Sequence, residues 1–323
     1  MWYSGFLALL LLASDADEKH LVARLKELTR IYDEYDSQQT AAGERARASV
    51  VREIAHLPFD GQARKDAGRL LARIVTEDRS FAVRADAARA IGRIGTPAGL
   101  SALYSALFGN EGRTRRYALL YSALPEALAN LRHPDDVEWV RTRILEPASR
   151  GADAPVLQQA GPLRKELVAL TLEGVGRAGL YTLHPQITLL AERASPEVRR
   201  AAIGALVDLE VHAPVIDRVL TESDAVLREA AARFPKLTEP QVRLTLEDPS
   251  QGVRRTAIRR LASRPPAEGT RLLILRLRDE QRADLRLDIA ETLNQLTGKE
   301  FGTDYDLWRS WWAAVGDRFE GPE

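Results

Sequence analysis

Apolar side chains recur at three- and four-residue intervals along most of the chain, and short breaks rich in Gly, Pro, Asp and Ser separate the runs. In the stretch SPEVRRAAIGALVDLE at 195–210, Val198, Ala202, Ile203 and Leu206 have the spacing of one face of an amphipathic α-helix. No segment alternates apolar and polar residues as a half-buried β-strand does. The pattern therefore predicts an all-α protein.

One short phrase returns along the chain: an apolar residue, an Arg, two variable residues, then a small and an apolar residue. Ala257 and Ile258 complete the copy that begins at Val253. A regular period of this kind is the signature of repeat architectures. Successive copies lie 26 to 37 residues apart except for one longer step, and their arginines are Arg47, Arg84, Arg116, Arg164, Arg199, Arg228, Arg254 and Arg286.

A second apolar helix is expected after each Arg-bearing helix. The stretches TPAGLSALYSALFG at 96–109, HAPVIDRVLTES at 212–223 and TEPQVRLTLEDP at 238–249 place Pro near the helix start, where its missing N–H is tolerated. A pair of short helices cannot bury its own apolar face, so neighbouring pairs must stack. The sequence thus predicts an α-solenoid (an α/α superhelix) of about eight helical hairpins over 44–297, with a loop or hinge near 147–162.

These phrases resemble the HEAT-repeat family of bacterial proteins, including the HEAT-like repeats of phycobilin-lyase type. The resemblance covers roughly residues 44–297 and rests on the Val-Arg-x-x-Ala phrases. It implies stacked helical hairpins tied together by a ladder of Asp and Arg side chains. The Arg half of that ladder is regular here. The acid half is patchy, because Glu197 and Asp224 precede their arginines whereas Gly252 stands before Val253.

Composition narrows the classes of partner and chemistry. The 46 basic residues balance the 46 acidic ones, so no net field draws the molecule to nucleic acid or anionic lipid. Arg outnumbers Lys 40 to 6, and the planar guanidinium suits fixed ion pairs between helices. Because the chain has no cysteine, disulfides, thiolate nucleophiles and Cys-ligated metals are excluded.

The N-terminus predicts a signal peptide over residues 1–16. An apolar run from Trp2 to Ala13 is followed by a small-x-small triplet that a signal peptidase could cut. The run is shorter than the roughly 20 residues of a membrane-spanning helix, so no span is expected. Export would place the protein in the periplasm or outside the cell. The alternative is a cytoplasmic protein whose apolar N-terminal helix packs on the first repeat, and residues 17–43 are expected to form an N-terminal capping helix in either case.

No pattern in the chain predicts a catalytic residue, a cofactor site or a metal site. GVGRAG at 174–179 has the spelling of a dinucleotide fingerprint, but a helix rather than a strand precedes it, so these glycines are expected to end a helix. None of the histidines has the spacing of a metal-ligand pair. They are His20, His56, His133, His184 and His212.

The segment 250–282 is locally basic, with nine arginines and three acids. One interpretation is the repeat ladder together with a solvated face. The other is a docking surface for an acidic protein or a nucleic-acid backbone. Interleaved aromatic residues that could stack on bases are absent from the segment, which weakens the nucleic-acid version.

The C-terminal segment 298–323 is rich in tryptophan. Trp308, Trp311 and Trp312 fall at i, i+3 and i+4, on one side of a helix that Thr303 or Asp304 can start. A stack of helical pairs needs a terminal unit to seal its last apolar face. The segment, which is similar to the ending of bacterial HEAT-repeat proteins, is therefore expected to be a cap, with an aromatic recognition patch as the alternative.

We expect the chain to be a non-enzymatic scaffold that binds another protein, of unknown identity, on the concave surface of the solenoid. Nucleic acid is not an expected partner. The resemblance leaves two alternatives: a lyase-type enzyme that attaches bilins, and a HEAT-like nucleic-acid-binding protein. The residues expected to contact the partner lie in the second helices and are Trp139, Arg143, Arg218, Arg243, Arg276 and Arg278.

Overall fold

The computed structural model describes residues 3–108, 118–131, 134–150 and 164–322. Within these ranges the secondary structure is helical, without a strand, and antiparallel helical pairs are stacked side by side. The all-α class and the helical-hairpin repeats predicted from the sequence are thus confirmed. The chain divides into two compact units, residues 1–205 and 206–323, and the boundary between them falls inside a helix.

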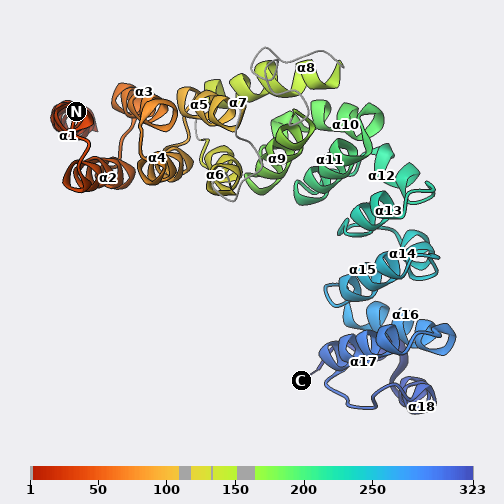
Figure 1. The fold of residues 1–323 in the computed structure, drawn as a ribbon. Coiled ribbons are helices and arrows are strands. Elements are labelled where there is room, and N and C mark those ends of the chain that lie inside the picture. The colour runs from red at the N-terminus through yellow and green to blue at the C-terminus, as the bar shows by residue number, and fades with distance from the viewer. Residues whose placement is uncertain (1–2, 109–117, 132–133, 151–163, 323) are drawn as a thin grey trace. The chain divides into compact units, whose positions relative to one another are not determined.

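In the first unit the Arg-bearing helices form one layer and their partners form the other (Figure 1). In the Arg layer, α2 packs on α4, α4 on α6 and α6 on α9; in the partner layer, α1 packs on α3, α3 on α5 and α8 on α10. The Arg layer of this unit contains α2 (Ala41–His56), α4 (Phe81–Ile94), α6 (Ala118–Ala129), α9 (Arg164–Arg177) and most of α11 (Pro196–Asp208). The partner layer contains α1 (Tyr3–Asp36), α3 (Gly61–Glu77), α5 (Pro97–Phe108), α7 (Pro134–Val140), the π-helix η2 (Arg141–Leu145), α8 (Glu146–Ser149), the 3₁₀ turn η5 (Tyr181–Leu183) and α10 (His184–Arg193).

The second unit repeats the same two-layer arrangement. Here α13 packs on α15 and α15 on α17, while α16 packs on both α17 and the last helix, α18. Its Arg layer contains α13 (Ala225–Ala232), α15 (Gln251–Leu261) and α17 (Ala283–Thr297). Its partner layer contains α12 (Pro214–Val219), α14 (Glu239–Leu246), α16 (Pro266–Asp279), α18 (Tyr305–Val315) and the 3₁₀ turn η6 (Gly316–Arg318).

The repeated phrase builds the core where its residues are described. In α4, the side chains of Val83, Ala87, Ala88 and Ile91 are at most 1% exposed, so the apolar stripe faces the interior as its spacing predicts. Small residues in this stripe let neighbouring helices approach closely. The same phrase in α15 buries Val253, Ala257, Ile258 and Leu261. The copy at Arg116 and the side chain of Arg164 lie outside the described residues.

Three arginines of the phrase, Arg47, Arg228 and Arg254, tie successive turns together through acids that do not immediately precede them in the sequence. Arg47 Nε lies 2.9 Å from Asp78 Oδ2, and Arg228 Nε lies 2.7 Å from Asp248 Oδ2. Each of these acids lies in the turn that leads to the next Arg-bearing helix. Asp224, expected as a ladder acid, instead caps α13 by accepting the backbone N–H groups of residues 226 and 227.

The third ion pair of this kind is between Arg254 and Glu280, with 2.9 Å between Nε and Oε2. The other arm of Arg254 donates to the backbone carbonyls of Asp248 and Pro249, in the turn before its own helix. The Glu280 carboxylate also accepts the backbone N–H of Arg282. Each guanidinium thereby joins the turn behind it to the turn ahead of it, and the acid in that turn fixes the start of the next helix.

Of the segments expected to form the signal peptide and the two caps, the structure describes residues 3–43 and 298–322. Helix α1 runs without a break from Tyr3 to Asp36 and packs against α2 and α3, and residues 41–43 of the expected capping helix belong to α2. Residues 147–149 of the expected loop or hinge belong to α8, and 151–162 lie outside the described residues. The boundaries of the signal peptide and the caps stay predictions.

Candidate functional site

A cleft of about 530 Å³ opens in the first unit where α8 and α10 end and where α9 and α11 begin. Its apolar walls come from α8, α9, α10 and α11 and are formed by Ala148, Val168, Leu189, Leu190, Ala194 and Val198. Among these residues, Leu189 is a large apolar residue that remains 38% exposed. The volume lies within the range of small-ligand and peptide pockets.

Local sequence explains why the helices end at this cleft. Helix α10 stops at Arg193, and Ala194 has an extended conformation with ψ 178°. Pro196 begins α11 two residues later, at a helix start where its missing N–H is tolerated. Arg199 Nε then donates to the Ala191 carbonyl at 2.8 Å, which holds the start of α11 against the end of α10.

The other wall follows from a proline inside a helix. The segment from α7 to α8 is continuous, but its middle turn, Arg141–Leu145, is a π-helix in which Glu146 N–H bonds to the Arg141 carbonyl. Pro147 has no N–H to offer the Arg143 carbonyl, and a proline ring clashes with the carbonyl four residues back, so the preceding turn widens. This bend carries α8 and Arg150 to the rim of the cleft.

The charges of the described residues that line the cleft are of one sign. These residues include Arg150, Lys165 and Arg193, and none of the described lining residues is acidic. Lys165 and Arg193 are exposed and form no ion pair or hydrogen bond with any residue that the structure describes. Arg150 has a single, long contact with Glu146 at 3.8 Å, and its side chain is 75% exposed. We call the whole lining of this pocket the cationic cleft.

A hydroxyl group is also available there. Ser195 lines the cationic cleft, and its Oγ atom is shielded from solvent and has no hydrogen-bond partner among the described residues. Buried polar atoms without partners are uncommon because their desolvation is not compensated. The cleft therefore combines positive charge, a free hydroxyl and an apolar surface.

Two other clefts among the described residues of the first unit lack this imbalance. The cleft of about 510 Å³ between α7 and the segment before α10 contains Glu138 and Arg141, which pair with each other. In the groove of about 340 Å³ between α1 and α3, Arg69 pairs with Asp66 and Arg73 pairs with Asp33. Their charged groups are already largely matched, whereas those of the cationic cleft are not.

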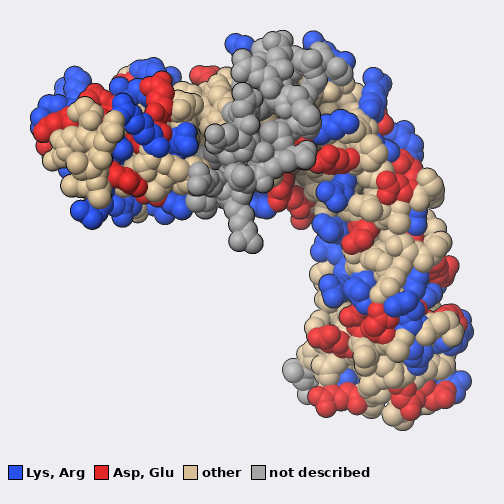
Figure 2. All heavy atoms as spheres, viewed as in Figure 1, with Lys and Arg blue, Asp and Glu red and all other residues tan. Residues whose placement is uncertain are grey.

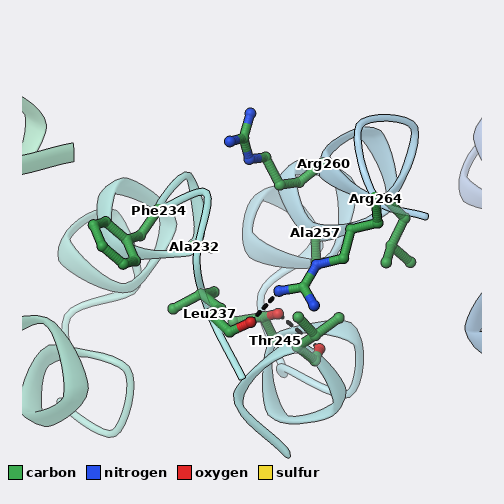
Figure 3. Close-up of a pocket in the computed structure, with 9 residues that line it drawn as sticks. Ala232, Phe234, Leu237, Thr245, Ala257, Arg260 and Arg264 are labelled. Carbon is green, nitrogen blue, oxygen red and sulfur yellow. Dashed lines mark hydrogen bonds between the residues drawn. The ribbon is translucent and has the colours of Figure 1, made fainter. Parts of the chain in front are cut away.

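One cavity among the described residues of the second unit is too small for a ligand. It measures about 10 Å³, the space of a single water molecule, and lies between α13, α14 and α15. Figure 3 shows Arg264 reaching the Leu237 carbonyl across it while Arg260 points away from that bond. Arg260 Nε has no hydrogen-bond partner among the described residues, so a buried water is the occupant that this cavity suits.

The structure scatters the residues predicted to contact a partner over the partner layers of both units. In the first unit, the half-buried Trp139 packs on the fully buried Tyr104, with 6.4 Å between the ring centroids, so much of its ring serves the core. Arg143 is exposed and forms no ion pair with any described residue. No described contact joins it to the cationic cleft.

The predicted contact residues of the second unit are mostly occupied by acids. Arg243 pairs with Glu239 at 2.8 Å, Arg276 with Glu280 at 2.7 Å and Arg278 with Asp279 at 2.8 Å. Arg218 is exposed on α12 and also has an interaction partner. These four arginines therefore offer a partner less uncompensated charge than the sequence suggests.

Intramolecular pairing also neutralises most of the basic segment 250–282. Arg255 binds Asp284 and Asp288, each at 2.7 Å, and Arg271 binds Glu239 at 2.7 Å. The acids come from helices on either side of the segment, which is why a count within 250–282 misses them. On the face shown in Figure 2, basic and acidic side chains alternate over the described parts of both units. The geometry favours the first interpretation of this segment, in which its arginines belong to the repeat ladder and to a solvated face.

The three C-terminal tryptophans have unequal surroundings. Trp308 is fully buried, its Nε1 donates to the Gly302 carbonyl at 2.8 Å, and its ring lies edge-on to Phe301 at 4.9 Å. Trp311 and Trp312 are half-buried and contact Phe319, at centroid distances of 5.3 and 6.4 Å. Trp308 thus belongs to the core of the second unit, and only Trp311 and Trp312 retain exposed ring surface.

The glycine-rich motif takes part in helix packing and in a helix end. Gly179 has φ +66° just beyond α9, the left-handed conformation that ends many helices. Gly174 lies inside α9, where an added Cβ would come within 2.9 Å of the Pro125 backbone in α6. Among the described residues no group of three His, Asp or Glu side chains has the geometry of a metal site. No helix in those ranges has both the length and the apolar character that crossing a bilayer requires.

No pattern in the sequence singles out Arg150, Lys165, Leu189 or Arg193 as site residues. One signal was present: Leu189 lies beside the apolar stripe that Ile187, Leu190 and Ala191 form on α10. The convergence of cations from different helices, in contrast, depends on how the helices stack.

No family model and no curated protein matches the sequence. Among solved structures, the chain is similar to the complex of CpcE and CpcF of phycocyanin lyase from Nostoc sp. PCC7120. That match has 16% identity and a TM-score of 0.31, and covers 82% of this chain and 93% of the other. A match to the Pds5–Scc1 complex has 12% identity and a TM-score of 0.27, and covers 86% and 59% of the two chains. A match to an engineered protein has 15% identity and a TM-score of 0.26, and covers 84% and 96%.

Proposed function

We propose that the chain is a non-enzymatic scaffold that binds a protein partner, with the cationic cleft as its principal contact. The observation that carries the proposal is the charge imbalance of that cleft. Elsewhere the described arginines are largely paired, as Arg47, Arg228 and Arg254 are, whereas Lys165 and Arg193 form no ion pair with a described acid. Cations held together at a cleft favour an incoming anion, because complementary charge steers and orients association.

A capture experiment in extract of the native host tests this proposal. The bait is the full chain, with in-cell crosslinking before purification. The cleft variant carries Lys165→Glu and Arg193→Glu together, and Arg45→Glu is the matched control, because Arg45 is an exposed cation without an ion pair to any described residue. We expect a protein that crosslinks to the wild type and the control and is lost from the cleft variant.

Two results would contradict the scaffold proposal. One is nucleic acid, rather than protein, as the species that crosslinks to the wild type. The other is a purified chain that turns over a substrate or transfers a bilin to an acceptor protein. Equal capture by the wild type and the cleft variant would instead retain the scaffold and remove the cleft from it.

We also propose that the protein is exported. The support is the apolar run from Trp2 to Ala13 and the small residues that follow it. The test is the intact mass of the chain recovered from each cell fraction. We expect a periplasmic or secreted form that lacks about the first 16 residues, and a cytosolic chain beginning at Met1 as the sole species would contradict export.

A further inference from the structure

The walls of the cationic cleft are arranged so that cations surround an apolar surface. Leu189 and Leu190 come from α10, and Val168 and Val198 come from α9 and α11. The cations lie at three different elements: Arg150 follows α8, Lys165 is in the first turn of α9, and Arg193 ends α10. A ligand that fills the cleft therefore meets apolar side chains and positive charge at the same time.

We propose that the cationic cleft binds a peptide segment of the partner in which acidic side chains flank an apolar one. This rests on the scaffold function proposed above and names the chemistry that the site recognises. The apolar side chain packs on Leu189 and the wall residues around it. The flanking carboxylates pair with Arg193, Lys165 and Arg150.

Carboxylates suit these cations better than a neutral polar segment does. An Arg guanidinium can bind a carboxylate through two parallel hydrogen bonds, and Lys supplies a mobile point charge. No acid among the described lining residues competes for them. The unpartnered Ser195 hydroxyl can donate a further hydrogen bond, either to a carboxylate or to a backbone carbonyl of the peptide.

An apolar anchor follows from the exposure of Leu189. A leucine left 38% exposed beside buried Leu190 and Val198 gains contact area when an aliphatic side chain covers it. Nucleic acid would match the charges but not this surface, because none of the described lining residues is an aromatic that could stack on a base. The combination of aliphatic wall and cations favours the peptide.

A labelled peptide tests the proposal directly. The probe is a fluorescent peptide, acetylated and amidated at its ends, with the sequence Asp-Glu-Leu-Glu-Asp between Gly-Ser flanks, and the readout is fluorescence anisotropy with the full chain. We expect saturable binding that weakens as salt rises from about 50 to about 300 mM, because exposed ion pairs are screened. Replacing the central Leu by Ser, with the acids kept, lowers the affinity about fivefold.

Charge reversal locates the binding. The double variant Lys165→Glu and Arg193→Glu lowers affinity for the acidic probe by at least about tenfold, whereas Arg45→Glu leaves it unchanged. A probe with Lys in place of each acid binds the double variant better than the wild type. Lys165 and Arg193 are exposed, so these changes leave the fold intact, which far-UV circular dichroism confirms.

The outcomes separate this inference from the proposed function. If the acidic probe does not bind, or binds the double variant as well as the wild type, the inference is wrong even when a native protein is still captured. Preference for a single-stranded oligonucleotide over the peptide at equal charge overturns it in favour of nucleic acid. Loss of discrimination between Leu and Ser at the central position removes the apolar anchor and with it the inference.

Discussion

At the scale of single residues, the Glu280 carboxylate is notable because it accepts hydrogen bonds from Arg254, Arg276 and the Arg282 backbone N–H. Burial opposes the ionisation of its carboxyl group, but hydrogen bonds from Arg276 and Arg254 and from the Arg282 amide outweigh that effect and hold its pKa at about 2. An ordinary glutamate has a pKa near 4.5. A difference of that size corresponds to about 3 kcal/mol in favour of the folded state at neutral pH.

Glu280→Gln should lower the free energy of unfolding of the second unit by about 3 kcal/mol, because it leaves two partly buried guanidiniums without a counter-charge. The side chains of Arg254 and Arg276 are only 12% and 15% exposed. Urea unfolding followed by circular dichroism measures the loss. Asp279→Asn is the matched control, since the Arg278–Asp279 pair is exposed and its loss should change stability little. Equal effects of the two variants would contradict this role of Glu280.

The same carboxylate predicts a pH dependence. Because folding depresses the pKa of Glu280, its contribution is fully present above about pH 4.5 and is lost as the pH falls toward about 2. Asp248, whose pKa is also lowered, adds to the loss in the same direction. We expect the melting temperature to fall through that window in the wild type and to fall less steeply in Glu280→Gln. Parallel curves for the two proteins would show that Glu280 is not the titrating group.

At the scale of helices, glycines decide how closely some pairs approach. Gly174 of α9 faces α6, where an added Cβ would lie 2.7 Å from Leu128 Cδ1 and 2.9 Å from the Cα atom of Pro125. The backbone of Pro125 cannot move aside as a flexible side-chain end can. The close contact between α6 and α9 therefore depends on the missing side chain.

Gly174→Ala should destabilise the first unit by about 1–2 kcal/mol, because the overlap outweighs the better helix propensity of alanine. Gly204→Ala, in α11, is the matched comparison. No atom lies within 4 Å of the Cβ it would add, so it should stabilise the helix by about 0.5–1 kcal/mol. Thermal melts of the two variants should move in opposite directions, and a shared sign would contradict the packing argument.

The helices themselves were predictable from the sequence because their signals are local. Asp304 caps α18, and Gly298 ends α17 with φ +69°, as the sequence indicates. The partners of the phrase arginines were not, since Asp78, Asp248 and Glu280 lie 20 to 31 residues away, in turns of variable length. The cationic cleft was missed for the same reason: three-dimensional packing gathers its cations from separate helices, and no short motif records that.

At the scale of the array, the ladder couples each turn to the next. Arg254 holds the carbonyls of Asp248 and Pro249 on one side and the Glu280 carboxylate on the other. Repeat proteins gain much of their stability from such nearest-neighbour interfaces. Removing one of these arginines should therefore destabilise the turns on both sides of it, while helices farther along the same unit are destabilised less.

Arg254→Met makes that expectation measurable. Hydrogen exchange followed by mass spectrometry should show faster exchange at the turns near 246–252 and 278–284 than in the wild type, because both lose their guanidinium contacts. Peptides from α12 serve as the internal control and should change least. Faster exchange confined to α15, or spread evenly over the whole unit, would contradict coupling between neighbouring turns.

Arg286, the last arginine of the repeated phrase, differs from Arg47, Arg228 and Arg254 in the group that it binds ahead of its helix. Arg286 donates to the carbonyls of Leu277 and Glu280 behind it, but ahead of it finds the Thr303 carbonyl instead of a carboxylate. Because Arg47, Arg228 and Arg254 each pair with an acid in the turn ahead of their helix, a unit of this kind carries its own ion pair to the next one. Gene duplication could then add whole units to the stack, because each added unit carries the ion pair that joins it to the next. At Arg286 the forward acceptor is a backbone carbonyl, so no carboxylate is left without a cation after the last pair.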